Sequence, residues 1–142
     1  MLLEFRGGGA VLLVPTFIAA SKIHGVGLFA GRDIARGEPL WEFTRGLDIR
    51  FEFEDVGRFP LHVQRRVRHY CYVNPARPGA LVLCGDDARF WNFDTDPNTV
   101  EDAPPRFDRE SVLVAARPIA AGEELTVGLE TDADAARKLS HR

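Results

Sequence analysis

Short apolar runs separated by turn residues recur along the chain, a pattern typical of a protein built mainly from β-strands. Two runs near the start, Leu2 to Phe5 and Val11 to Ile18, flank the glycines at 7–9 and predict a β-hairpin. Further on, Leu81 to Cys84 is an apolar run bounded by turn residues, which predicts a short buried strand. The pattern therefore predicts a mainly β fold with short strands.

One segment of the chain occurs twice. Residues 28–40 reappear without gaps as residues 113–125, and eight of these thirteen positions are identical. Each copy predicts a strand, a turn that places an isoleucine against the core, a Gly-Glu pair and a second strand. That second strand is Leu40 to Phe43 in one copy and Leu125 to Leu129 in the other. Two similar units indicate a pseudo-symmetric β body, since a solenoid needs at least roughly three repeats.

Between the two copies the sequence predicts one helix. It begins at Pro60, because proline suits the first position of a helix. It should end near residues 73–75, because the residue before Pro75 is disfavoured in the helical region. Its apolar face is expected to carry Val63, Val67, Tyr70 and Cys71.

The length of 142 residues is that of one domain. We assign residues 1–130 to a single domain and residues 131–142 to a polar, alanine-rich tail, either a frayed helix or disordered. The sequence is 45% apolar and 27% charged, which is ordinary for a globular protein. Its net charge of -3 offers no broad electrostatic footprint for nucleic acid, although a local basic patch stays open.

The two cysteines, Cys71 and Cys84, are too few and too far apart to form a zinc site by themselves. We therefore expect no metal, and we interpret both as reduced thiols of a cytoplasmic protein. Residues 10–20 resemble a signal-peptide core, but Pro15 interrupts the run, so a cleaved signal is not expected. No apolar run approaches the ~18 residues of a membrane helix.

An aromatic cluster around one carboxamide is the feature that neither a strand nor a helix explains. Phe90, Trp91 and Phe93 surround Asn92, and residues 94–98 are turn formers that hydrogen-bond their own backbone. A buried carboxamide among rings is unfavourable unless it is paired. Asn92 is therefore expected either to hold two crossing segments together or to bind a polar ligand group. Taken alone, the run also fits a strand end that continues into a turn.

Gly25 and Gly27, on either side of Val26, form a second candidate binding segment. Glycines let a backbone approach a ligand closely or turn at positive φ. The pair lacks the third glycine and the following helix of a dinucleotide-binding fingerprint, so a bare tight turn is the alternative.

In order and spacing, these segments resemble the SET domain, a family of S-adenosylmethionine-dependent protein-lysine methyltransferases. The resemblance covers roughly Val11 to Leu129. It implies a β-clip-like fold of short twisted sheets with one short helix, in which the last strand passes under a loop as a pseudoknot. The segments that carry it are His24 to Ala30, Ile34 to Glu38, Ala88 to Asn92 with Pro97 and Asn98, and Ile119 to Thr126.

The resemblance also implies a binding site for S-adenosylmethionine, the methyl donor. Backbone groups of the glycine segment would contact its amino-acid part, and aromatic rings would pack on its adenine and sulfonium. The implied partner is a lysine of a protein or peptide, with no direct nucleic-acid or membrane binding; a homodimer stays open. The residues assigned to the donor are His24, Gly25, Val26, Gly27, Arg89, Phe90, Asn92 and Phe93.

The chain departs from the family's pattern at two places. The family follows its asparagine with His-Ser-Cys, where this chain has Phe93-Asp94-Thr95. The family also ends its last strand with a tyrosine that lines the methyl-transfer pore, and the matching position here is Leu129. Leucine keeps an apolar wall but removes a hydroxyl that orients the amine, so slow or altered catalysis is expected. Tyr72 is our candidate for a substitute hydroxyl, whereas Tyr70 is expected in the core.

No cysteine follows Cys84, so the zinc-bound flap of some family members is not available. The tail from Thr131 to Arg142, or a partner subunit, would have to cover the lysine channel. The leading hypothesis is a lysine methyltransferase. The alternatives are a binding module that holds donor or peptide without turnover, and a structural relative with a clip-like β fold whose glycines are only turns.

Overall fold

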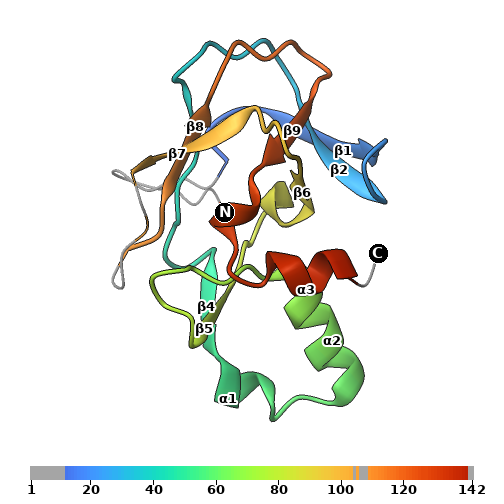
Figure 1. Cartoon of the computed structure of the whole chain (residues 1–142), viewed down its shortest axis with the longest axis vertical. Helices are drawn as coiled ribbons and strands as arrows, with labels where there is room; N and C mark the ends of the chain where they lie inside the picture. Colours follow the sequence, from blue (N-terminus) through green and yellow to red (C-terminus); the bar gives the residue numbers. More distant parts are fainter. Residues whose placement is uncertain (1–11, 104, 106–108, 141–142) are drawn as a thin grey trace, which may run out of the picture.

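A computed structural model describes residues 12–103, 105 and 109–140. Short strands in three small sheets form most of its regular structure, so the predicted mainly β fold is confirmed (Figure 1). The predicted strand at Leu2 to Phe5 lies outside the described residues.

The largest sheet has four strands in the order β1-β2-β9-β6, and its β6–β9 pair is parallel. A second sheet has the order β3-β8-β7, and β4 pairs with β5 in the third. The strands of the first sheet are β1 (Thr16–Ala20), β2 (Val26–Ala30), β9 (Glu124–Val127) and β6 (Asn92–Phe93). The others are β3 (Pro39–Trp41), β8 (Val112–Ala115), β7 (Thr99–Ala103), β4 (Ile49–Glu52) and β5 (Ala80–Leu83).

The two similar segments meet as a pseudo-symmetric pair at the top of Figure 1. Ile34 and Ile119 exchange two backbone hydrogen bonds, of 2.8 and 2.9 Å. Gly122 donates to Ala30 at 2.7 Å, and its counterpart Gly37 donates to Ala115 at 2.8 Å. The two copies therefore make equivalent backbone hydrogen bonds to each other, as a pseudo-symmetric β body requires.

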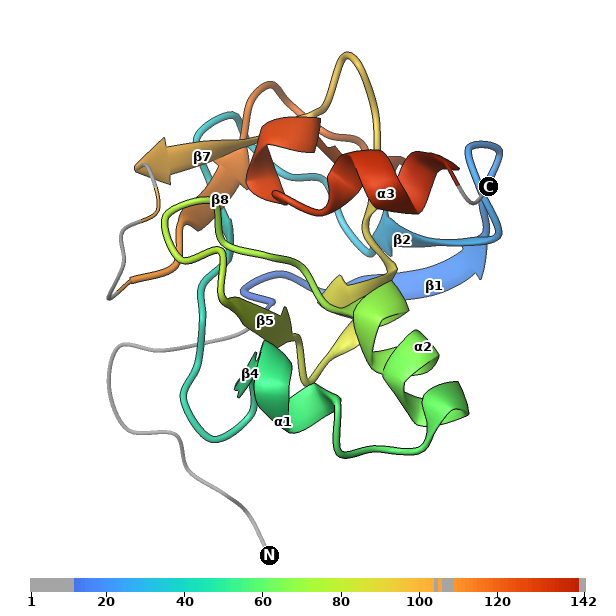
Figure 2. The same cartoon turned by 60° about the horizontal axis from the view of Figure 1, so that its bottom comes forward.

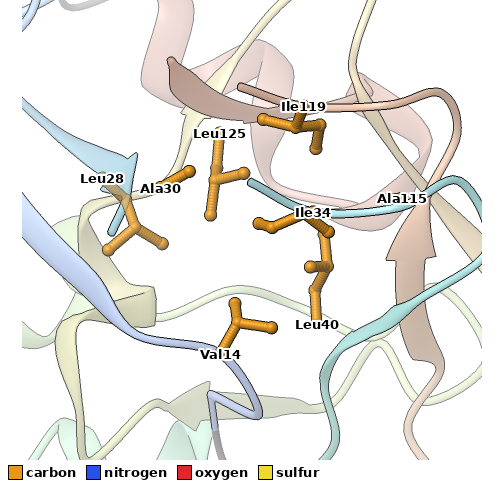
Figure 3. Close-up of a cluster of buried hydrophobic side chains, with 8 residues drawn as sticks. All are labelled: Val14, Leu28, Ala30, Ile34, Leu40, Ala115, Ile119 and Leu125. Carbon is orange, nitrogen blue, oxygen red and sulfur yellow. The ribbon is translucent and has the colours of Figure 1, made fainter. Parts of the chain in front are cut away.

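Residues of both copies form one apolar cluster, shown in Figure 3. Ile34 is 2% exposed and Ile119 is 1% exposed. Burying a side chain of this size stabilises a fold by about 1.5–3 kcal/mol. The cluster contains Val14, Leu28, Ala30, Ile34, Leu40, Ala115, Ile119 and Leu125.

Two predicted strand boundaries are wrong. The run predicted from Val11 to Ile18 is described from Leu12 onward, and there it becomes a strand only at Thr16. Leu12 forms a bridge with Trp41, and the Leu13 amide donates to the carbonyl of Leu40, before the chain pairs with β2. The last strand ends at Val127 instead of Leu129, and Leu129 begins the 3₁₀ turn η2 (Leu129–Thr131).

The predicted helix is present as α2 (Leu61–Tyr70), but its predicted end near residues 73–75 is wrong. Cys71 is extended and Tyr72 pairs with Val82 of β5, so strand pairing overrides helix continuation. Cys71 consequently lies outside the helix, and its side chain is buried in a core cluster with Leu81.

The described structure contains two further short helices, of which only α1 was not predicted. α1 (Phe53–Val56) follows β4, and α3 (Ala135–Ser140) lies in the tail, where a frayed helix was one of two expectations. Figure 2 shows α3 lying across the end of α2, where Arg137 donates to the carbonyl of Arg68 at 3.2 Å. None of the helices in the described part of the chain is long and apolar enough to cross a membrane.

Candidate functional site

The glycine segment forms an ordered turn between β1 and β2. The Ser21 amide donates to the carbonyl of Gly25 at 2.8 Å, and the Ser21 hydroxyl accepts the amides of Ile23 and His24 at 2.9 and 3.2 Å. Gly25 has a φ of 49°, in the left-handed region that favours glycine. The turn presents the backbone of His24 and Val26 on one side.

Asn92 ties this turn to the aromatic segment. It follows the 3₁₀ turn η1 (Asp87–Phe90) and is 5% exposed. Its side-chain amide donates to the carbonyls of His24 and Val26 at 3.1 and 3.2 Å. It also donates to a carboxylate oxygen of Glu124 at 3.4 Å. Of the two roles expected for Asn92, the structure therefore contains the one that holds crossing segments together.

Gly27 makes room for the same carboxylate. A Cβ atom at this position would lie 1.9 Å from Oε1 of Glu124 and 3.1 Å from Cβ of Ser21. A side chain there would displace Glu124 from Asn92. Gly27 therefore serves the packing beneath the turn, and it does not itself line the cavity described next.

A cavity of about 830 Å³ opens where these segments meet. This volume lies within the range of roughly 300–1,000 Å³ that is usual for small-molecule sites. Leu129 does not line the cavity and is 43% exposed. The predicted site residues that do line it are His24, Gly25, Val26, Tyr72, Arg89, Phe90, Asn92 and Phe93. Two predicted segments, at residues 24–26 and 89–93 and so at least 63 residues apart in the sequence, thus share one wall.

The two tyrosines occupy different parts of the cavity wall. Tyr70 packs edge-on against Phe90, with ring centroids 5.7 Å apart. Tyr72 packs edge-on against Trp41 at 6.1 Å, and its buried hydroxyl lies beside the carboxylate of Glu110 without completing a hydrogen bond of standard geometry to a described residue. Burial, together with the negative charge of Glu110, raises the pKa of Tyr72 well above its usual value. Tyr72 is therefore a neutral hydroxyl at the inner end of the site.

The tail after β9 forms part of the same wall. Thr131, Asp132, Arg137 and Lys138 all line the cavity. Asp132 is 3% exposed, accepts the Val73 amide at 2.9 Å and pairs with Lys138 at 2.6 Å. These contacts fix η2 and α3 against the end of α2. From the sequence, the tail or a partner subunit was expected to cover the lysine channel, but no sequence pattern pointed to this ion pair.

Asn98 is a structural residue of the site to which sequence reasoning assigned no role. Its side chain donates to the Glu124 carbonyl at 2.8 Å and accepts the Thr126 amide at 2.9 Å. The backbone amide of Asn98 donates to the Thr126 hydroxyl at 3.1 Å. These bonds hold the turn at residues 94–98 against β9. A second asparagine close after Asn92 was the signal that was available.

The described residues contain no cluster of His, Cys, Asp or Glu that could hold a metal ion. Cys71 and Cys84 are both buried free thiols. Burial raises the pKa of Cys71 to about 12, so this thiol stays protonated and unreactive at neutral pH. Neither cysteine is therefore a candidate nucleophile.

The chain resembles known proteins over most of its length. The SET-domain family model matches residues 25–128. Histone-lysine N-methyltransferase 2D of Homo sapiens is 30% identical over 118 residues, which cover 82% of this chain and 2% of that protein. The chain thus spans only a small part of this relative.

Two solved structures are similar in fold. One is the Neurospora SET domain protein DIM-5, a histone lysine methyltransferase, which is 21% identical to this chain and superposes with a TM-score of 0.58. The similar region covers 83% of this chain and 53% of the DIM-5 chain. The ctPRC2 complex in an autoinhibited conformation bound to S-adenosylmethionine has a TM-score of 0.63 at 24% identity, covering 94% of this chain and 17% of that one. Since the family match spans both the Gly25 turn and the Asn92 segment, the protein belongs to the SET-domain family.

Proposed function

We propose that the protein binds S-adenosylmethionine in this cavity and transfers its methyl group to a lysine of a protein substrate. The observation that carries the proposal is the convergence of the Gly25 turn and the Asn92 segment on one cavity, held by the bonds from Asn92 to His24 and Val26. Family membership and the likeness to a fold solved with the same donor support it.

The residues of the cavity fit the parts of this donor. Backbone groups of the turn at His24 to Val26 suit its polar amino-acid part, and the rings of Phe90, Trp91 and Phe93 suit adenine and a sulfonium. When bound, the donor would supply an electrophilic methyl group. The chain itself has to bind and orient both reactants and favour an unprotonated amine.

Deprotonation of the target lysine is the first task. An ordinary lysine has a pKa near 10.4, so removing its proton at pH 7 adds about 4.6 kcal/mol to the apparent activation barrier. Arg89 and Lys138 line the cavity, and neighbouring cations disfavour an ammonium. Leu113 and Val127 add apolar wall that also disfavours the charged form. Both effects lower the pKa of an inserted lysine.

Orientation of the amine is the second task, and we assign it to the hydroxyl of Tyr72. Positioning of reactants contributes up to roughly 7–11 kcal/mol to catalysis. Tyr72 lines the cavity and carries a buried hydroxyl beside Glu110, whereas Leu129 lies outside the lining.

The test compares Tyr72→Phe with Tyr70→Phe, since both changes remove one hydroxyl from the same wall. We expect Tyr72→Phe to lower kcat about tenfold to a hundredfold with unchanged calorimetric affinity for the donor, and Tyr70→Phe to change kcat less than about threefold. Transfer is measured from labelled S-adenosylmethionine to lysine-containing peptides. If the wild-type protein binds neither the donor nor its demethylated product, the proposed function is wrong.

The exposed position of Leu129 favours one alternative, a binding module without turnover. Such a module keeps the cavity but lacks the pore hydroxyl of the family. Calorimetric donor binding without methyl transfer to any lysine peptide would identify it.

A further inference from the structure

The wall of the cavity carries a surplus of positive charge. Arg65 and Arg68 of α2, Arg89 of η1, and Arg137 and Lys138 of α3 all line it. Among the described residues in the lining, Asp132 supplies the only carboxylate. The whole chain has a net charge of -3, so this clustering runs against the overall charge of the protein.

Three of these cations have no anionic partner. Arg137 pairs with Asp134 and Lys138 with Asp132, each at 2.6 Å. In the described part of the chain, Arg65, Arg68 and Arg89 form no ion pair with a carboxylate. The Nε atom of Arg68 is also buried without a hydrogen-bond partner there. Arg89 donates from Nε to the carbonyl of Asp86 at 3.3 Å, and Arg68 lies over the ring of Phe53 at 5.7 Å, but neither contact neutralises the positive charge. The charges of these guanidinium groups can therefore act on a ligand.

The positive charges of separate segments act on one place. Burial lowers the pKa of His69, and the charges of Lys138, His24, Arg66 and Arg137 lower it further. These groups belong to α2, α3 and the Gly25 turn. Positive potential therefore extends across the side of the cavity where α2 and α3 meet (Figure 2).

The methyl donor does not balance this charge. It has one type of anionic group, a carboxylate, against an ammonium and a sulfonium, so its net charge is positive. A target lysine adds a further positive group. A substrate segment rich in lysine and arginine would be repelled, whereas carboxylates can bind guanidinium groups through paired hydrogen bonds.

We infer that the protein methylates lysines that have aspartate or glutamate beside them in the sequence, rather than lysines in basic tails; this rests on the proposed methyl transfer. Arg65 and Arg68 bind the acidic side chains next to the target lysine. A protein segment fits better than nucleic acid, because the free cations line a concave wall shared with aromatic residues and the chain as a whole is acidic.

The test uses three peptides of equal length, each with one lysine, flanked by acidic, neutral or basic residues. Affinity is measured by fluorescence anisotropy with and without the demethylated donor, and kcat/KM is measured for transfer. We expect the acidic peptide to bind at least about tenfold more tightly than the basic one, with a preference that weakens as salt increases.

Arg65→Glu is the diagnostic variant, because Arg65 is an exposed residue of α2 with no ion pair in the described structure. It should weaken acidic-peptide binding about tenfold and leave calorimetric donor affinity unchanged. Arg36→Glu is the matched control, since it makes the same charge change at an exposed position outside the cavity lining. It should change neither affinity.

Equal affinity for the three peptides, or tighter binding of the basic one, would overturn the inference. So would tighter binding of a single-stranded or duplex oligonucleotide in the same assay. Failure of the proposed function is read separately, from donor calorimetry and transfer. Acidic-peptide binding without any transfer would overturn the methyl-transfer proposal and support recognition of acidic flanks by a binding module.

Discussion

At the scale of single residues, the site depends on one carboxylate placed between two segments. Glu124 accepts a hydrogen bond from Asn92 and lies where a side chain at position 27 would be. A side chain at 27 would have to push the end of the Glu124 side chain away, whereas Gly25 is favoured by its positive φ and has open space around it. Two glycines one residue apart thus serve different physical needs.

This difference predicts unlike costs for two similar substitutions. Gly27→Ala should destabilise the fold by about 1–3 kcal/mol and weaken donor binding, because the new Cβ forces Glu124 away from Asn92. Gly25→Ala should cost about 1–2 kcal/mol from the left-handed backbone alone. Urea denaturation measures both. Adding Glu124→Ala should recover part of the loss in Gly27→Ala and nothing in Gly25→Ala. A Gly27→Ala variant as stable as wild type would contradict the close approach.

At the scale of elements, α3 is held at the C-terminal end of α2. The Lys138 ammonium donates to the carbonyl of Cys71, and Arg137 to that of Arg68. Cationic side chains are favourable beside the last carbonyls of a helix. The tail thereby closes one side of the cavity.

The same packing predicts a pH dependence of stability. Burial and the charges of Lys138, His24, Arg66 and Arg137 lower the pKa of His69, so the unfolded chain takes up the proton more readily than the folded one. The contribution of His69 to the free energy of unfolding is therefore most favourable above the unfolded pKa of about 6.5. It becomes less favourable as the pH falls through that value toward the lower pKa of the folded state.

Urea midpoints at about pH 7.5 and 5.5 measure this effect. His69→Gln should make the decrease in midpoint smaller, because it removes the titrating group. His62→Gln, at an exposed position in the first turn of the same helix, is the control and should keep the wild-type decrease. An unchanged decrease in His69→Gln would assign the pH dependence to other groups.

At the scale of the whole molecule, the fold is organised around two copies of one β unit. Their turns exchange equivalent hydrogen bonds, and Gly37 and Gly122 have nearly equal φ angles of 79° and 84°. Glu38 and Glu123 each accept the amide three residues earlier in their own turn, at 3.0 and 2.9 Å. The turns of the two copies are therefore alike in backbone conformation and in this side-chain hydrogen bond.

Equivalent positions should therefore have equivalent energies. Ile34→Val and Ile119→Val should each lower the free energy of unfolding by about 0.5–1.5 kcal/mol, because each removes one buried methylene group. Ile49→Val makes the same change at a position that is 47% exposed, and it should cost less than about 0.5 kcal/mol. Denaturant titration measures all three. A large cost at only one of the two buried positions would show that the copies differ energetically.

Local patterns in the sequence were sufficient for much of the architecture. Repeated apolar spacing predicted the strands of both copies, and the short run at Leu81 to Cys84 predicted β5. Pro60 placed the start of α2 correctly. These features depend on neighbours in the chain, so a sequence pattern contains them.

Contacts between distant residues decided the rest. Because Tyr72 pairs with Val82, α2 ends at Tyr70, before its predicted end. Because Leu12 pairs with Trp41, β1 begins at Thr16, later than predicted. The cations of α2, η1 and α3 are scattered in an acidic sequence, and only the tertiary structure gathers them around one cavity. The chain alone determined the strands, their repeat and the family motifs, because each is encoded over a few consecutive residues. The shape and charge of the site depended on packing between segments far apart, because the interactions that set them exist only after those segments meet.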